Sequence, residues 1–147
     1  MMVNSRTKGA SFERQVVKIL NDFFADNDLN YTCKRNLDQY QESGQCDVPI
    51  PFHAVECKSY KEGTWIKTEW WRQVCDSAKG DIPVLIYKFN RVPIRVCVPL
   101  HAINPDWEKD NQKIAVLPLE EWLDVLKLNW KIYEALAQIK TIQLDGT

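Results

Sequence analysis

The run PVLIYKF at residues 83–89 constrains the fold more than any other part of the sequence. It is almost continuously apolar, which is typical of a central strand with both faces buried. Residues 93–100 form a second strand pattern, in which branched apolar side chains alternate. Residues 65–79 precede the run and have a helical pattern, which we expect to start after Thr64 as N-cap and to end at Gly80.

The remaining elements follow from apolar periodicity. We expect an amphipathic helix over 8–27, a short strand over 31–35, a polar loop over 36–45, two strands within 46–59 joined at 51–52, a short strand over 113–117 and a helix over 119–139. This order predicts an α/β fold with a central mixed sheet flanked by helices.

Length and composition narrow the class of protein. At 147 residues we expect one domain, 1–147, in which 101–147 add a C-terminal strand and helix. With 45% hydrophobic and 27% charged residues the chain is typical of soluble globular proteins, and no apolar run is long enough for a membrane helix. The N-terminus lacks a signal-peptide core, and the five scattered cysteines suggest no disulfide framework. We therefore expect a cytoplasmic protein, in the host cytoplasm if a phage encodes it.

The net charge of −1 is unevenly distributed. Residues 1–35 carry a net charge of +2, 36–52 carry −3, 53–99 carry +3 and 100–147 carry −3. This modest polarity is as compatible with chance as with a basic face around a small acidic pocket and an acidic tail turned away from DNA.

Asp47 and the triplet Glu56-Cys57-Lys58 form the pattern D-x8-E-x-K. If the two strands turn about residues 51–52, Asp47 and Glu56 oppose each other with Cβ atoms about 5 Å apart. Two such carboxylates repel each other, and a divalent cation removes that penalty; hard oxygen ligands suit Mg²⁺. Lys58 shares a face with Glu56, where it can orient or help deprotonate a water or stabilise charge on a phosphate.

The alternative is a solvated strand face with a cross-strand Glu–Lys pair, which the spacing alone favours. The apolar Ala54 and Val55 mark the strand as buried, and a buried Glu and Lys need a reason to converge. This context favours metal-assisted attack on a phosphodiester.

These residues make the sequence resemble the PD-(D/E)XK nuclease superfamily, and within it the archaeal-type Holliday-junction resolvases and their small phage relatives. The stretches that carry the resemblance are SRTKGASFERQVVKIL, KRNLDQYQESGQCD, AVECKSY and WWRQVCDSAKGDIPVLIYKFNR. Together they cover about residues 5–100, whereas residues 101–147 show no recognisable resemblance. One departure is Cys46, which stands before Asp47 where the family pattern has proline.

The resemblance implies a restriction-endonuclease-like fold and a set of active-site residues. Asp47, Glu56 and the backbone carbonyl of Cys57 would ligate Mg²⁺, for which Mn²⁺ would substitute, and Lys58 would lie near the attacking water. Glu13 on the first helix would hold a water on the metal or support a second metal. Gln73 on the helix behind the motif would assist the site.

The expected activity is structure-selective DNA endonuclease cleavage, as in junction resolution during DNA recombination or repair. Phosphate contacts are expected from a set of basic side chains: Arg6, Lys8, Lys34, Arg35, Lys61, Lys67 and Arg72. Symmetric nicking of a four-way junction implies a homodimer; we expect branched DNA as partner, no membrane and no small-molecule cofactor. The alternatives are a nicking, restriction-like or repair nuclease of the same superfamily, or a non-catalytic DNA-binding dimer.

Overall fold

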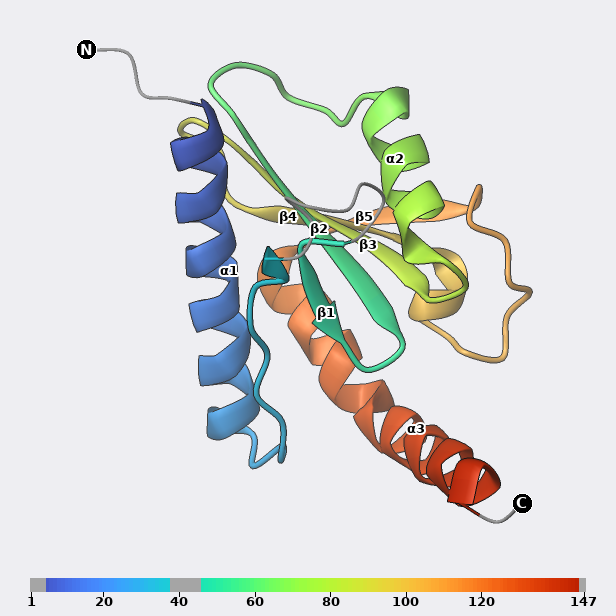
Figure 1. Cartoon of the computed structure of the whole chain (residues 1–147). Coiled ribbons are helices and arrows are strands. Elements are labelled where there is room, and N and C mark those ends of the chain that lie inside the picture. The colour runs from blue at the N-terminus through green and yellow to red at the C-terminus, as the bar shows by residue number, and fades with distance from the viewer. Residues whose placement is uncertain (1–4, 38–45, 146–147) are drawn as a thin grey trace.

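The computed structural model describes residues 5–37 and 46–145, which form one five-stranded sheet covered by helices on both faces (Figure 1). The helices are α1 (Ser5–Asp26), α2 (Thr68–Ala78) and α3 (Leu119–Asp145), and a 3₁₀ turn, η2, spans Leu100–Ala102. The strands are β1 (Val48–Ile50), β2 (His53–Tyr60), β3 (Ile82–Phe89), β4 (Arg95–Pro99) and β5 (Ile114–Pro118). Their order is β1-β2-β3-β4-β5, so the apolar run indeed forms the central strand.

The sheet is mixed, as predicted, because α2 returns the chain so that β3 runs parallel to β2. The other neighbouring strands pair antiparallel. Alternation along β3 separates two cores: Val84 and Ile86 pack under α1 and α3, whereas Leu85 and Tyr87 pack under α2. The two faces of β2 therefore meet different helices, and this decides which side chains surround the acidic motif.

The β1–β2 hairpin has the register expected from the sequence. Val48 pairs with Val55 and Ile50 with His53, so the chain turns at residues 51–52. Asp47 directly precedes β1, and its N–H donates to the carbonyl of Val55, the neighbour of Glu56 in β2. β1 has only three residues, so the second half of β2 extends past the end of its neighbour on this edge.

The strand predicted over 31–35 is wrong. This segment is not part of the sheet, and the side-chain amide of Asn21 on α1 satisfies the backbone of Cys33 instead. Asn21 Nδ2 donates to the Cys33 carbonyl at 3.0 Å, and the Cys33 N–H donates to Asn21 Oδ1 at 2.8 Å. Because Asn21 bonds both the N–H and the C=O of Cys33, neither backbone group is available to pair with a strand. Most of the predicted loop 36–45 lies outside the described residues.

The second helix starts later than predicted, at Thr68, with Lys67 as N-cap instead of Thr64. The physical reason is that Ile66 first anchors the chain in the core under α2. Gly63 adopts φ +137° beside the ring of Phe89, where a Cβ would come within 2.5 Å of the ring. The helix ends at Ala78, before Gly80 as expected.

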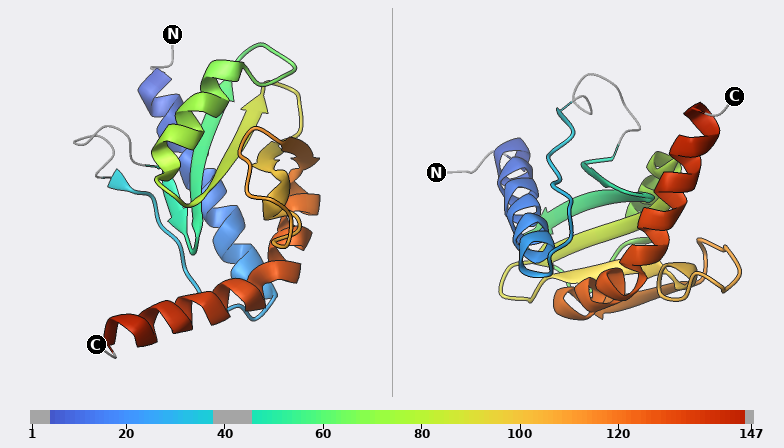
Figure 2. Two further views of the ribbon diagram at one scale, coloured as in Figure 1. Left: turned by 90° about the vertical axis from the view of Figure 1, so that its right-hand side faces the viewer. Right: turned by 90° about the horizontal axis from the view of Figure 1, so that it is seen from below.

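The third helix continues to Asp145, beyond the predicted end at 139, and its C-terminal half projects past the sheet (Figure 2). Its first half is buried through Trp122, Leu126 and Trp130. None of the helices within residues 5–37 and 46–145 is both long enough and apolar enough to cross a membrane.

His53 at the hairpin turn provides a prediction about pH. It is buried, its Nδ1 lies 2.6 Å from the carbonyl oxygen of Pro51, and burial lowers its pKa to about 4. Below pH 6.5 His53 takes up a proton in the unfolded chain but stays neutral in the folded chain until about pH 4. The free energy of unfolding therefore decreases as the pH falls. From pH 7 to pH 4 this one group is expected to remove about 3 kcal/mol.

Urea denaturation of the parent and His53→Gln at both pH values measures this loss, because glutamine does not titrate. The difference in stability between pH 7 and pH 4 should be smaller in the variant. An equal loss in both proteins would contradict the assignment.

Candidate active site

The acidic motif lies just before the first residue of β1, where β2 extends beyond β1 and has no neighbouring strand on that edge. The Asp47 N–H donates to the Val55 carbonyl at 3.0 Å, which holds Asp47 against β2. One carboxylate oxygen of Asp47, Oδ2, accepts a 2.8 Å hydrogen bond from the Cys57 N–H. The Asp47 side chain thus takes the place of the strand partner that β1 is too short to supply.

This hydrogen bond also orients the backbone of Cys57. In an antiparallel strand the N–H and C=O of one residue point to the same edge. The Cys57 carbonyl therefore faces the edge where Asp47 lies, while its side chain is buried under α1. The backbone oxygen thus lies on the same side of β2 as the Asp47 carboxylate.

The pKa of Glu56 is strongly perturbed at this edge. Burial, the negative charge of Asp47 and hydrogen bonding to Asp47 raise the pKa of Glu56 to about 9; Lys58 opposes the rise, and Glu13 adds to it. At neutral pH and without a cation, the pair of carboxyl groups therefore holds a proton. A divalent cation can bind such a pair in place of that proton, because it balances the negative charge of both carboxylates.

Lys58 lies one strand step beyond Glu56 on the same face of β2. In the parallel register Glu56 pairs with Leu85 and Lys58 with Tyr87, and both of these partners pack under α2. Lys58 is half-buried, and its positive charge stabilises the ionised form of Glu56. The predicted convergence of Glu56 and Lys58 is therefore present in the structure.

Glu13 reaches this region from α1, which covers the other face of the sheet. It is 6% exposed, and Arg35 Nε lies 3.3 Å from Glu13 Oε1. The side chain of Arg35 is only 15% exposed. Glu13 raises the pKa of the buried Cys57 thiol, after burial and Asp47, which places its charge close to the motif.

Because Arg35 pairs with Glu13, it lies beside the candidate site. The sequence did not predict this position of Arg35. Arg35 was predicted to contact DNA, but its guanidinium is largely enclosed by the protein. The two residues are 22 positions apart, and no sequence pattern links them.

Asn36 is a second residue that sequence reasoning missed. Its N–H donates to the Asp47 carbonyl at 2.7 Å, and its Nδ2 donates to the Cys46 carbonyl at 3.2 Å. These bonds tie the segment after α1 to the residues just before β1. Nearby, burial and the charges of Glu56 and Asp47 raise the pKa of the Cys46 thiol to about 11, so this cysteine is a neutral thiol.

The other predicted site residues are more dispersed. Gln73 is exposed on α2, outside the stripe of buried residues that faces the sheet, and no hydrogen bond joins it to the carboxylates in the part of the chain that the structure describes. Lys34, Lys61 and Arg72 are exposed. Lys67 is also exposed, and its ammonium lies 5.7 Å from the ring centre of Trp70. The side chains of Arg6 and Lys8 lie outside the described residues.

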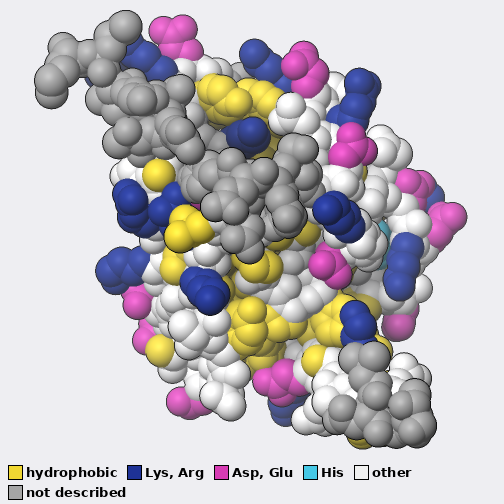
Figure 3. All heavy atoms as spheres, viewed as in Figure 1, with side chains coloured by type: hydrophobic (Ala, Val, Ile, Leu, Met, Phe, Trp, Pro, Cys, Tyr) yellow, Lys and Arg dark blue, Asp and Glu magenta, His cyan; other side chains and the backbone are white. Residues whose placement is uncertain are grey.

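The surface on the side seen in Figure 1 carries both signs of charge. Figure 3 shows Lys and Arg side chains interspersed with Asp and Glu, together with hydrophobic patches near the middle. The visible side chains form no continuous basic field. A binding role for the basic residues therefore stays a prediction.

The donor set at the motif fits a hard divalent cation. Within residues 5–37 and 46–145, no three His, Cys, Asp or Glu side chains converge as a ready-made metal site. The available oxygens are instead two carboxylates, Asp47 and Glu56, and the Cys57 carbonyl. Burial and the charge of Asp47 raise the pKa of Glu56, as expected where two carboxyl groups lie close together, and oxygen ligands of this kind suit Mg²⁺ or Mn²⁺ better than softer metals.

Comparison with known proteins identifies the family. No curated protein matches the chain. Among solved structures, the chain is similar to Hjc of Archaeoglobus fulgidus, a Holliday junction resolvase, with 16% identity over 75% of this chain and 86% of that one and a TM-score of 0.44. Residues 4–140 match the family described as "Phage putative PDDEXK endonuclease", which is nearly the whole chain. The chain therefore belongs to this phage PDDEXK endonuclease family and is a nuclease.

Proposed function

We propose that the chain is a DNA endonuclease that depends on Mg²⁺, with Asp47, Glu56 and Lys58 at its centre. The observation that carries the proposal is the position of the Asp47 carboxylate, which the Cys57 N–H holds at 2.8 Å beside the partly buried Glu56. Burial and the charge of Asp47 raise the pKa of Glu56 to about 9. Two carboxylates so close together repel each other and lower the stability of the fold. A cation bound between them would be attracted by both charges and would remove this repulsion.

Asp47, Glu56 and the Cys57 carbonyl would hold the ion, and Mn²⁺ would substitute for Mg²⁺. When bound, the ion polarises the scissile phosphate and promotes ionisation of the attacking water. The Cys57 N–H fixes Oδ2 of Asp47 and thereby orients the carboxylate that would hold the cation. Glu13, buried and held by Arg35, supplies a further negative charge at the rim of the site.

Lys58 supplies the mobile positive charge. Its ammonium can donate hydrogen bonds to a non-bridging phosphate oxygen, where negative charge grows in the transition state. The half-buried position of Lys58 strengthens this interaction relative to bulk water. Gln73 remains a candidate that would have to reach the site from the side of α2.

We propose branched DNA, in particular the four-way junction, as the substrate. The support is the sequence resemblance of residues 5–100 to junction resolvases. Lys34, Lys61, Lys67 and Arg72, together with Arg6 and Lys8, are the proposed phosphate contacts. Arg35 is assigned to positioning Glu13 first, because it is enclosed by the protein.

A homodimer is proposed with the projecting part of α3 as its interface. Five apolar residues on this helix are exposed, at spacings of four, four, three and three: Leu128 78%, Ile132 45%, Leu136 45%, Ile139 52% and Ile142 68%. These spacings keep the side chains along one side of a helix. An apolar stripe of this length on a projecting helix fits a second copy of the same stripe.

Cleavage of a four-way junction beside its isolated linear arms tests the substrate assignment. With Mg²⁺ present, we expect paired nicks in the junction and cleavage of the arms slower by about tenfold or more, a difference of about 1.4 kcal/mol. Equal cleavage of both substrates would favour the nicking, restriction-like or repair alternative. No cleavage of any DNA, together with no Mn²⁺ binding to the parent or equal Mn²⁺ binding by Asp47→Asn, would favour the non-catalytic DNA-binding dimer.

A further inference from the structure

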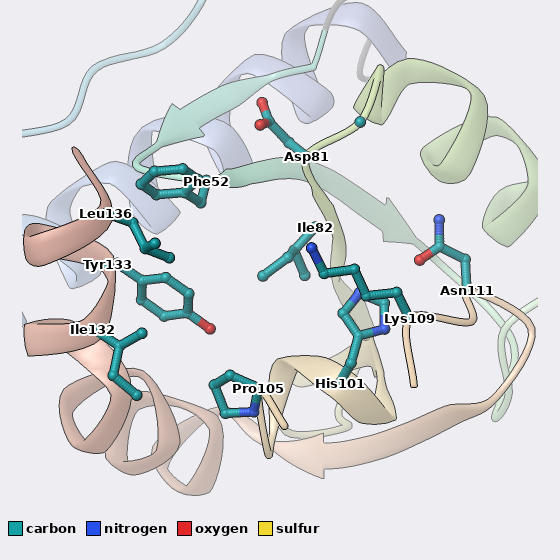
Figure 4. A pocket seen from close by; sticks show the side chains of 11 residues that line it. Phe52, Asp81, Ile82, His101, Pro105, Lys109, Asn111, Ile132, Tyr133 and Leu136 are labelled. Carbon is teal, nitrogen blue, oxygen red and sulfur yellow. The ribbon is translucent and has the colours of Figure 1, made fainter. Parts of the chain in front are cut away.

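A cavity of about 360 Å³ lies beside the turn between β1 and β2, where β3 begins (Figure 4). It is bounded by the hairpin turn at Phe52, the start of β3 at Ile82, the segment between η2 and β5, and α3. Phe52 and Glu56 are four residues apart, which corresponds to roughly 13 Å of extended strand. None of the residues proposed to act on DNA lines this cavity.

Two buried polar atoms at this cavity have no protein partner within residues 5–37 and 46–145. They are the hydroxyl of Tyr133, a residue 4% exposed, and Nδ1 of His101, which is 7% exposed. Buried hydroxyl and imidazole groups are nearly always hydrogen-bonded in folded proteins. Figure 4 shows the Tyr133 hydroxyl directed into the cavity, with the ring of His101 on the far side of it. What fills the cavity therefore has to satisfy both atoms.

Lys109 supplies a positive charge at the cavity. It extends over the cavity next to His101 (Figure 4), and burial together with the charge of Lys109 lowers the pKa of His101, while the charge of Asp110 opposes this shift. The imidazole is therefore neutral at neutral pH. No ion pair engages Lys109 in the described part of the chain. Burial raises the pKa of Asp81, the acidic residue of the lining, and the charge of Lys140 opposes this rise.

The rest of the lining is apolar and partly aromatic. Phe52 and Tyr133 have ring centres 6.2 Å apart and planes within 28°, and Ile82, Ile132 and Leu136 complete this wall. Pockets for small ligands range from about 300 to 1,000 Å³, so this cavity suits a molecule of one ring system.

We propose that this cavity binds a small molecule that consists of a planar ring and a single oxyanionic group, either a carboxylate or a phosphate. The ring lies against Phe52, Ile82 and Leu136, and the oxyanion accepts hydrogen bonds from Lys109, Tyr133 and His101. This binding site goes beyond the proposed nuclease activity and does not depend on it. A free aromatic acid and a nucleoside monophosphate share this chemistry.

Calorimetric titration of the full chain with four probes tests the proposal and separates the two sources. Benzoate is compared with the neutral benzamide, and thymidine 5′-monophosphate with thymidine. We expect each anion to bind about tenfold or more tightly than its neutral counterpart, as a charge-assisted hydrogen bond predicts. Tighter binding of the monophosphate identifies a nucleotide as the source, and tighter binding of benzoate identifies a free acid.

Two variants locate the binding. Lys109→Gln should weaken benzoate by about tenfold and leave benzamide unchanged, and Tyr133→Phe should weaken both while keeping the ring. Lys127→Gln, an exposed lysine on α3 outside the cavity, is the matched control. Because the Tyr133 hydroxyl has no protein partner, Tyr133→Phe should melt at or above the temperature of the parent.

Three outcomes would overturn the proposal. They are no binding of either anion at millimolar concentration, equal affinity for anions and their neutral counterparts, and binding that neither Lys109→Gln nor Tyr133→Phe changes.

Discussion

Replacing Lys58 by alanine is expected to lower the rate of DNA cleavage by about two to four orders of magnitude, the usual contribution of a positioned acid–base or charge-stabilising group. Lys58 shares a face of β2 with Glu56 but is not an oxygen donor, so Mn²⁺ binding should be retained. Single-turnover cleavage of a labelled junction, with calorimetric Mn²⁺ titration of the same preparation, measures both properties.

The matched control is Lys127→Ala, which removes an exposed lysine on α3 far from β2 along the fold. It should cleave like the parent. If Lys58→Ala also cleaves like the parent, the assignment of the catalytic lysine is wrong. If it loses Mn²⁺ binding together with cleavage, the lysine maintains the fold of the site and not the chemistry.

Replacing Glu56 by glutamine is expected to weaken Mn²⁺ binding by more than about a hundredfold, since loss of even a supporting group at a metal site costs about 10- to 100-fold. The pH dependence should change as well. In the parent, the carboxyl pair keeps its proton until about pH 9, so a cation has to displace that proton at neutral pH. Affinity should therefore rise about tenfold per pH unit below pH 9.

Titrations between pH 6 and pH 8, in buffers with different ionisation enthalpies, count the released proton directly. The parent should release about one proton per ion bound, and Glu56→Gln should lose this linkage. Glu62→Gln changes an exposed acid in the loop after β2 and should behave like the parent. Mn²⁺ affinity in the parent that does not vary with pH would contradict the shared proton.

Local patterns in the sequence were sufficient to predict the strands that carry the motif. The equal spacing of Asp47 and Glu56 from residues 51–52 implied the register that Val48 and Val55 adopt. This worked because an antiparallel hairpin converts sequence distance from the turn directly into spatial opposition. The apolar run of β3 was equally informative, since burial on both faces leaves few positions in a sheet.

Contacts between distant segments could not be predicted in the same way. The sequence around Arg35 does not show whether its side chain pairs with Glu13 or contacts a phosphate, because both roles require only a guanidinium. The 31–35 segment has the composition of a strand, yet Asn21 on α1 takes the backbone groups of Cys33. Likewise, nothing in the sequence around His101 and Tyr133 indicates that their polar atoms meet at one cavity.

The two bonds from Asn36 close the base of the segment that leads to Asp47. Asn36 and Asp47 lie together whatever sequence connects them, so that connection is free to change without moving the acid. Since each doubling of a loop costs only about 0.6 kcal/mol, a change in the number of residues between Asn36 and Asp47 is expected to cost little stability, provided that both bonds still form. The position of the acid thus depends on Asn36 more than on the length of the chain that connects the two residues.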